Sequence, residues 1–323
     1  MRRLIAFTTG GALLLAGLML ASPAQAAYPG PNGLISLRGT VGDHSQLFTI
    51  DPASLTMVQL THLTDGDVAS AAHWSPDFNM LTFEVDNLAD GCAQVATLPS
   101  TGGDPTLLPL VNHDVCEGTP TFSADGTRII YEGYNGRRRD ALYSMNLDGS
   151  DRRFVTACQG RGVSAPEASP DGRMLAFTCT SRDGSALFVS SVTGSQLRQL
   201  TPYSTQVGFH EDWSPDSRRI MFITIPNEGT PEAQINTWTI GADGSDLVQL
   251  TNYPPGGLRA YGNSYSPDGR TIVMRIEKDD GTGGFQSALF TMPATGGTPT
   301  QMTPYSDFRP RGMVWGSECP CSP

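Results

Sequence analysis

The sequence predicts an all-β protein, a six-bladed β-propeller of four-stranded antiparallel blades that is closed by pairing of its N- and C-terminal strands. Three observations lead to this prediction: a recurring turn phrase, short apolar segments between its copies, and complementary half-units at the two ends of the chain. The composition agrees with it. The 36 Gly and 24 Pro among 323 residues disfavour a helical bundle, because both residue types destabilise helix interiors.

The turn phrase is Ser-Pro-Asp-Gly or a close variant. Its serines follow one another at intervals of 48, 46, 45 and 52 residues, at Ser75, Ser123, Ser169, Ser214 and Ser266. In such a turn Pro presets φ, Asp bonds back to the chain, and Gly takes the left-handed conformation. The Asp residues of the phrase are therefore predicted to form turns and not to act as catalytic groups: Asp77, Asp125, Asp171, Asp216 and Asp268.

Each phrase is followed by the remaining strands of one unit. An apolar strand comes first, at residues 80–83, 129–131, 174–177, 220–223 and 272–274. A polar loop and another strand come next, most clearly at residues 141–145, 186–189 and 288–292. The last strand of the unit ends in Leu-Thr or Met-Thr, at residues 60–61, 200–201, 250–251 and 302–303. Together with the strand that leads into the phrase, these segments make one four-stranded blade, and radial stacking of blades buries their faces.

The two ends of the chain complete each other. Residues 32–37 match the second half of the phrase and its following strand, but the strand before the phrase is missing. Residues 313–316 match that missing strand and then the repeat stops. The tail therefore supplies the innermost strand of the blade that the head begins, which leaves no exposed sheet edge. Trp74, Trp213 and Trp315 share one position of the repeat and are predicted to pack between blades.

The repeat resembles the WD40-like Ser-Pro-Asp-Gly (PD40) propeller repeat of the TolB family, over about residues 32–316. The Gly-His and Trp-Asp signatures of true WD40 repeats are absent. The resemblance implies the propeller fold and leaves the activity open. TolB carries an α/β domain ahead of its propeller, whereas here only a few residues separate the predicted cleavage site from the first strand.

The first residues resemble an export signal. Arg2 and Arg3 precede an apolar run over residues 4–20 and a small-residue stretch that ends at Ala26. This order is typical of a secretory signal peptide, so we expect cleavage near Ala26 and a secreted or periplasmic protein. Retention of the segment as a membrane anchor is the alternative.

The predicted organisation has three parts. Residues 1–26 form the signal peptide, residues 27–318 the six-bladed propeller, and residues 319–323 a Cys-containing tail. Cys319 and Cys321 of this tail pair with each other or with another molecule, and the sequence leaves both open.

Charge restricts the class of partner. The chain has 32 acidic and 21 basic residues, for a formal net charge of −11. Nucleic-acid binding is not expected, because it needs a basic surface that displaces counterions. No segment after the leader is apolar enough to span a bilayer. The sequence thus predicts a monomer without a cofactor, whose partner is a protein, a peptide or a cell-envelope component.

Strand parity predicts the disulfides. Successive connections of an up-and-down blade alternate between the two ends of the ring. We name the end with the Ser-Pro-Asp-Gly turns the bottom face, and the end with the long central loops the top face. Cys92, Cys116, Cys158 and Cys179 all fall on the top face. Neighbouring positions then predict Cys92–Cys116 and Cys158–Cys179, among the 15 pairings that six cysteines allow. No Cys-x-x-Cys pair suggests zinc.

Candidate ligand-binding residues lie at the top face, close to the starts of the inner strands. They are Glu117, Glu167, His210, Glu211, Asp212, Arg259, Tyr261, Arg309 and Arg311, with Arg137 on a central loop. The run from His210 to Asp212 could bind a cation or move a proton. The interpretation we favour for that run is an exposed polar loop that leads into Trp213. His73 is expected to be a hydrogen-bonded structural residue.

No nucleophile–base set is apparent in the sequence. The Gly-x-Ser-x-Gly pentapeptide of hydrolase domains does not occur. A non-catalytic binding or scaffold module is therefore the leading hypothesis. The alternative is a metal-assisted carbohydrate-active enzyme that resembles the oligogalacturonate lyases, with a three-histidine site from His73, His113 and His210. A mainly structural envelope protein is the third possibility.

Overall fold

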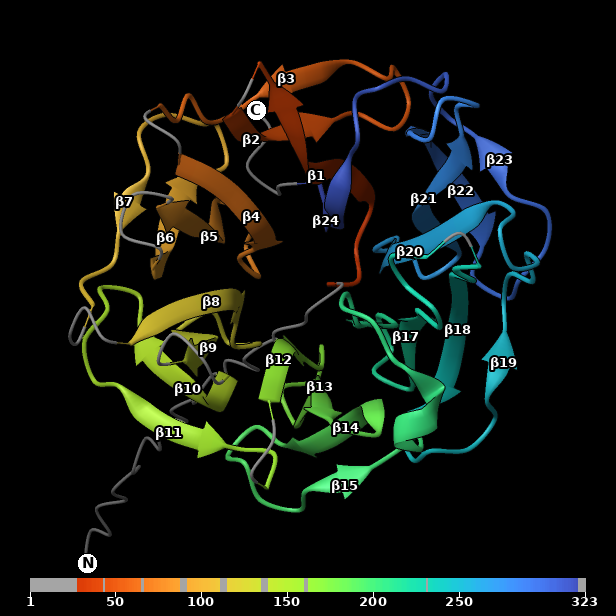
Figure 1. Ribbon diagram of the computed structural model, residues 1–323. Helices are drawn as coiled ribbons and strands as arrows, with labels where there is room; N and C mark the ends of the chain where they lie inside the picture. Colours follow the sequence, from red (N-terminus) through yellow and green to blue (C-terminus); the bar gives the residue numbers. More distant parts are fainter. Residues whose placement is uncertain are drawn as a thin grey trace, which may run out of the picture.

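Four-stranded antiparallel sheets stand around a central axis in the computed structural model of the chain (Figure 1). The structure describes residues 28–318, except 43, 65–66, 88–91, 111–114, 135–138, 160–161 and 231. The predicted signal peptide, the tail cysteines Cys319 and Cys321, and the candidates Arg137 and His113 lie outside the described residues. Among the described residues, no helix has both the length and the apolar character that a membrane crossing requires.

Strands run from the axis outward in each blade, in the order of the chain. The first blade holds β4 (Asp67–Trp74), β5 (Met80–Asn87), β6 (Cys92–Pro99) and β7 (Thr106–Leu107). The second holds β8 (Cys116–Phe122), β9 (Arg128–Tyr134), β10 (Arg139–Asn146) and β11 (Arg153–Thr156). The third holds β12 (Gly162–Ala168), β13 (Met174–Ser181), β14 (Gly184–Ser191) and β15 (Arg198–Gln199).

The remaining three blades follow the same plan. The fourth holds β16 (Asp212–Trp213), β17 (Arg219–Thr224), β18 (Asn236–Gly241) and β19 (Val248–Gln249), after the 3-10 turn η1 (Tyr203–Thr205). The fifth holds β20 (Arg259–Tyr265), β21 (Thr271–Asp279), β22 (Phe285–Pro293) and β23 (Thr300–Gln301). The sixth combines β24 (Arg311–Ser317) with β1 (Asn32–Val41), β2 (His44–Ile50) and β3 (Met57–Gln59).

The last strand of the chain pairs with the first. β24 lies antiparallel to β1, with Trp315 opposite Ile35 and Val314 opposite Ser36. The Trp315 indole donates a 3.1 Å hydrogen bond from Nε1 to the Gly33 carbonyl. The blue β24 and the red β1 accordingly lie side by side near the centre of Figure 1. A single parallel bridge between β2 and β4 connects this blade to the first one.

The repeated phrase forms the same hydrogen-bonded turn five times. In every copy the Ser hydroxyl donates to the Asp Oδ1 over 2.6–2.7 Å. The Ser Oγ also accepts the backbone N–H five residues later. The left-handed position is Gly in three copies, but Phe78 and Ser217 occupy it in the other two, with φ of 57° and 59°. The phrase Asp residues are thus confirmed as turn formers.

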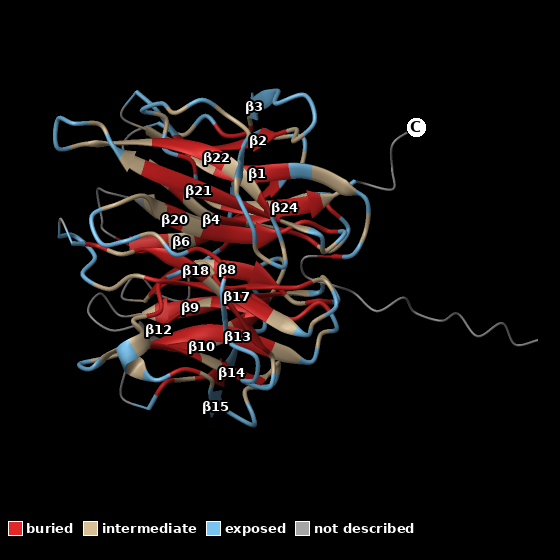
Figure 2. Ribbon diagram, turned by 90° about the vertical axis from the view of Figure 1, so that its right-hand side faces the viewer, coloured by how far each residue is buried: buried red, intermediate tan, exposed pale blue. Residues whose placement is uncertain are grey.

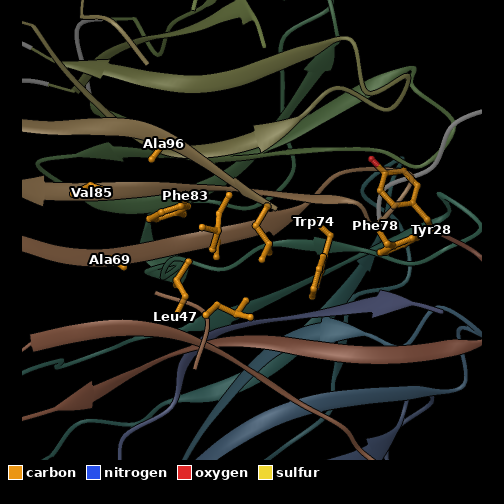
Figure 3. Packing of buried hydrophobic residues seen from close by; sticks show 12 residues of the cluster. Tyr28, Leu47, Ala69, Trp74, Phe78, Phe83, Val85 and Ala96 are labelled. Atoms are coloured by element: carbon orange, nitrogen blue, oxygen red, sulfur yellow. The ribbon is translucent and has the colours of Figure 1, made fainter. Parts of the chain in front are cut away.

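Apolar side chains fill the spaces between neighbouring blades. The cluster in Figure 3 joins Leu47 of β2 to Trp74 and Phe83 of the first blade. Trp74 Nε1 donates to the Val314 carbonyl of the sixth blade, and Trp213 Nε1 donates to the Glu167 carbonyl of the third. The predicted packing of the tryptophans between blades is therefore confirmed. Figure 2 shows the result, with buried strands in the body of the ring and exposed loops at its two faces.

Two disulfides connect neighbouring blades, and both have the predicted pairing. Cys92 at the start of β6 is bonded to Cys116 at the start of β8. Cys158, just after β11, is bonded to Cys179 of β13. The bonds thus link the first blade to the second and the second to the third. Both close short loops, since the bonded residues are 24 and 21 positions apart.

Candidate functional site

A cavity of about 320 Å³ lies in the central channel of the ring. Every blade contributes to its wall, the first to the sixth in order through His73, Thr119, Glu167, Glu211, Asn263 and Arg311. Arg311 begins β24 at the top face and is exposed, as is Phe209, which also lines the cavity and precedes the fourth blade. The cavity therefore opens toward the top face.

The inner strands bend where they line this cavity. Four non-glycine residues of its wall have positive φ: Ala71 at 49°, Thr119 at 42°, Ala165 at 52° and His210 at 81°. Ala71, Thr119 and Ala165 lie at β-bulges, where the register of the inner strand shifts against its neighbour. Left-handed non-glycine residues cost about 1–3 kcal/mol each and cluster at functional sites. The cavity wall thus includes four positions of strained backbone, three of them at equivalent bulges of the inner strands.

His73 and Glu167 form the floor of the cavity. His73 Nδ1 lies 3.1 Å from Glu167 Oε2. Burial lowers the pKa of His73 to about 4. Burial, and next the charge of Asp212, raise the pKa of Glu167 well above its ordinary value. Both groups therefore favour their neutral forms, and their contact is a hydrogen bond rather than an ion pair.

Tyr28 lies below this floor. It lines a much smaller void of about 20 Å³, to which His73, Glu167 and Asp212 also contribute. The Tyr28 ring packs edge-on against Phe78, with centroids 5.7 Å apart, and Figure 3 shows this contact. Since Tyr28 is only 7% exposed, its side chain fills the channel near the bottom face.

Glu211 is buried in the wall with one oxygen unsatisfied. The Thr178 hydroxyl donates to Glu211 Oε1, whereas Oε2 has no hydrogen-bond partner among the described residues. Glu211 is 4% exposed, and burial raises its pKa to about 8. A buried polar atom without a partner is rare in native proteins and calls for an explanation.

The expectation of an exposed polar loop from His210 to Asp212 is wrong. Glu211 and Asp212 are buried, and His210 is half-buried. Asp212 Oδ2 accepts a 2.6 Å hydrogen bond from the Tyr265 amide, and burial raises the pKa of Asp212 to about 7. Burial, and next the charge of Arg275, lower the pKa of His210 to about 3. The segment is buried because it runs along the channel into the inner strand β16.

The sixth blade makes the opposite wall basic. Arg38 of β1 and Arg311 of β24 both line the cavity, and they face each other in the β1–β24 register. Burial, and next the charges of Arg311 and Arg275, lower the pKa of Arg38. Arg275 lies behind them, where its guanidinium stacks 3.9 Å from the Tyr261 ring centroid and donates to the Pro310 carbonyl.

The predicted site residues divide into two groups. Four line the cavity: Glu167, His210, Glu211 and Arg311. The others that the structure describes are held elsewhere by packing or hydrogen bonds. Glu117 bonds Arg152, the Arg259 guanidinium lies over the Phe285 ring, and Arg309 donates to the Phe285 carbonyl. Tyr261 stacks on Arg275, and Asp212 is hydrogen-bonded below the floor.

A further sequence pattern marks residues close to the inner strands. A polar residue stands nine positions after four of the phrase serines, at Glu84, Glu132, Thr178 and Arg275. Each occupies the second strand of its blade and contacts an inner strand or the segment beside it. For example, Glu84 Oε2 accepts from the Thr119 amide over 2.9 Å. Polar residues at this position of an otherwise apolar strand therefore mark contacts with the inner strands, and one of them, Glu84, also lines the cavity.

Two of the three histidines of the lyase-like alternative, His73 and His210, line the cavity. The third, His113, lies outside the described residues. In the part of the chain that the structure describes, no three His, Cys, Asp or Glu side chains are grouped as ligands for a metal ion.

Comparison with known proteins identifies similar sequences. The family model described as PD40, TolB beta propeller domain, matches residues 109–304. The uncharacterized protein Atu1656 of Agrobacterium fabrum is 25% identical over 202 residues, which cover 60% of this chain and 65% of that protein. The Tol-Pal system protein TolB of Francisella tularensis is 25% identical over 187 residues, 57% of this chain. The match spans only 40% of the length of that TolB.

Solved structures share the fold at low sequence identity. TolB from Acinetobacter baumannii superimposes with a TM-score of 0.67 at 16% identity, covering 88% of this chain and 67% of that one. A chain of a nidogen/laminin complex gives 0.64 at 14% identity, covering 90% and 100%. An oligogalacturonate lyase in complex with manganese gives 0.55 at 14% identity, covering 85% and 74%. At these identities the similarity shows the fold alone.

Proposed function

The chain belongs to the TolB β-propeller family, and from this premise we propose that it is an exported, non-catalytic binding module. Its ligand is a protein, a peptide or a cell-envelope component, held at the top-face cavity. The relatives named Tol-Pal system protein TolB support a role in the cell envelope. Since the match spans less than half of those proteins, the partner is proposed from the site and not taken over from them.

The single observation that carries the proposal is the unsatisfied polar wall of the cavity. Glu211 Oε2 is buried without a partner, and strained backbone surrounds it. A merely structural channel would gain stability by pairing or removing such groups, because a buried polar atom without a partner costs about 1–3 kcal/mol. A concave site with a few convergent polar groups is typical of ligand binding.

Export fits the same proposal. We propose that residues 1–26 are removed as a signal peptide, that residues 27–318 form the propeller, and that residues 319–323 are a short tail. The two disulfides support an oxidising compartment outside the cytoplasm, because disulfides persist there and are rare in the cytosol.

A capture experiment tests the proposed function. The immobilised protein is exposed to an envelope extract, and retained proteins and glycans are identified by mass spectrometry. Arg311→Glu, which reverses a charge at the cavity entrance, is expected to reduce retention of the specific partner at least tenfold. A matched control is Arg218→Glu on a bottom-face turn, where the side chain is 83% exposed; it should retain the partner normally. Equal retention by both variants would contradict a top-face site.

A further inference from the structure

The cavity separates its charged groups onto different walls. Arg38 and Arg311 come from the sixth blade, whereas Glu211 comes from the fourth and Glu167 from the third. In Figure 1, β24 of the sixth blade faces β12 of the third across the centre of the ring. Glu84 of the first blade also lines the cavity, where its Oε2 accepts from the Thr119 amide. A ligand therefore meets the two guanidinium groups on the sixth-blade side and the carboxyl groups of Glu167 and Glu211 on the other.

The basic wall is ready to accept an anion. Arg38 is half-buried, and neither it nor Arg311 forms a hydrogen bond or an ion pair with any described residue. After burial, the charge of Arg311 lowers the pKa of Arg38 most, and the charges of Glu84 and Asp86 oppose this only in part. Two adjacent guanidinium groups match the planar geometry of a carboxylate, which each can bind through paired N–H donors.

The acidic wall is ready to accept a hydrogen-bond donor. Glu211 is more than nine-tenths buried, and its Oε2 lacks a partner although Thr178 already donates to Oε1. An ammonium group supplies up to three N–H donors and a positive charge. Both would compensate the burial of Oε2, for which the described residues provide no donor.

We propose that the cavity binds a small zwitterion of the amino-acid or dipeptide class. Its carboxylate lies between Arg38 and Arg311, and its ammonium group donates to Glu211 Oε2. This inference rests on the proposed binding function and names the ligand class of that same cavity. A simple anion would leave Glu211 unsatisfied, and a simple cation would be repelled by the arginine pair. The volume of about 320 Å³ is at the small end of the range for ligand pockets, about 300–1,000 Å³.

Isothermal titration of the full chain with L-alanyl-L-alanine tests the proposal. Two analogues each remove one end: N-acetyl-alanyl-alanine has no ammonium group, and alanyl-alanine amide has no carboxylate. The dipeptide is expected to bind, and each analogue to bind at least tenfold more weakly, a difference of about 1.4 kcal/mol.

Variants assign each end of the ligand to its wall. Arg38→Gln should weaken the dipeptide at least tenfold but leave the amide unchanged. Glu211→Gln should weaken the dipeptide similarly but leave the N-acetyl form unchanged. Arg218→Gln at the bottom face is the matched control and should bind as the parent does. Circular dichroism verifies that every variant is folded.

Two results would overturn the zwitterion proposal: no heat of binding from the dipeptide, or equal binding of the dipeptide and both analogues. If either occurs while Arg311→Glu still loses its envelope partner, the proposed binding function stands and only the ligand class is wrong. If Arg311→Glu keeps that partner while the dipeptide binds as described, the ligand class stands and the envelope role is wrong.

Discussion

A chain that ends at Asp307 is expected to lose its cooperative unfolding transition, because it lacks β24. Without that strand, β1 has an unpaired edge, and Met313 and Trp315 no longer fill the space in which they are 1% and 5% exposed. Trp74 Nε1 also loses its acceptor, the Val314 carbonyl. Removing one large core side chain costs about 3–5 kcal/mol, and a domain has only about 5–15 kcal/mol in total.

Near-ultraviolet circular dichroism during a thermal scan measures this effect. The truncated chain should show a broad, non-cooperative change or a melting temperature far below that of the intact protein. A chain that ends at Glu318 is the control, since it keeps β24 and loses only residues 319–323; it should melt as the intact chain does. A sharp transition at the normal temperature in the chain that ends at Asp307 would show that the last strand is dispensable.

Arg152→Ala is expected to destabilise the protein by about 3–5 kcal/mol at pH 8, because it leaves a buried carboxylate without its partner. Arg152 Nη1 donates to Glu117 Oε1 over 2.5 Å and to the Tyr131 hydroxyl over 2.8 Å. Glu117 is 1% exposed, and its burial raises its pKa to about 7 even though the Arg152 charge opposes this. The pair lies at the junction of the first two blades, where Arg152 Nη2 also bonds the Pro109 carbonyl.

The loss of stability caused by Arg152→Ala should be smaller at low pH than at high pH. A carboxyl group whose pKa is raised on folding destabilises the folded state above that pKa and ceases to do so as the pH falls and it becomes neutral. The free energy of unfolding, measured in urea, should therefore be closer to that of the parent at pH 5.5 than at pH 8. In the control, Arg152→Ala is combined with Glu117→Gln and compared with Glu117→Gln alone; since position 117 cannot titrate there, the loss should be equal at both pH values. A deficit of Arg152→Ala that is equal at both pH values would contradict the buried-charge explanation.

The fold could be predicted because its signals are local and repeated. Each turn is determined by contacts within six residues, such as the hydrogen bonds from Ser75 to Asp77 and from Met80 to Ser75. Strand parity then places the cysteines on one face, and the bonds Cys92–Cys116 and Cys158–Cys179 follow from it. The turns and the disulfide pairing can both be predicted without knowing which distant side chains are in contact.

The site was harder to predict because it depends on contacts between blades. Arg38 lies on the second strand of the sixth blade, yet it lines the channel, whereas all the predicted candidates except Arg137 lie near the starts of inner strands. Glu211 was interpreted as part of an exposed loop, but the channel and the Thr178 hydroxyl from the third blade bury it. Glu117 lies at the start of an inner strand as predicted, and Arg152, from the turn before β11 of the same blade, donates to it. These contacts form only when the chain folds and its strands and blades come together in the ring.

The basic wall of the cavity exists only if β24 lies against β1, so this pairing is the claim on which the proposed site depends most. Hydrogen-exchange mass spectrometry of the intact chain tests it directly. Amides of β1 should be protected as strongly as those of β9, the second strand of the second blade, because β1 is paired on both sides and paired amides exchange only on opening. Rapid exchange of about half of the β1 amides, as in a free edge strand, would contradict the closed ring and the cavity built on it.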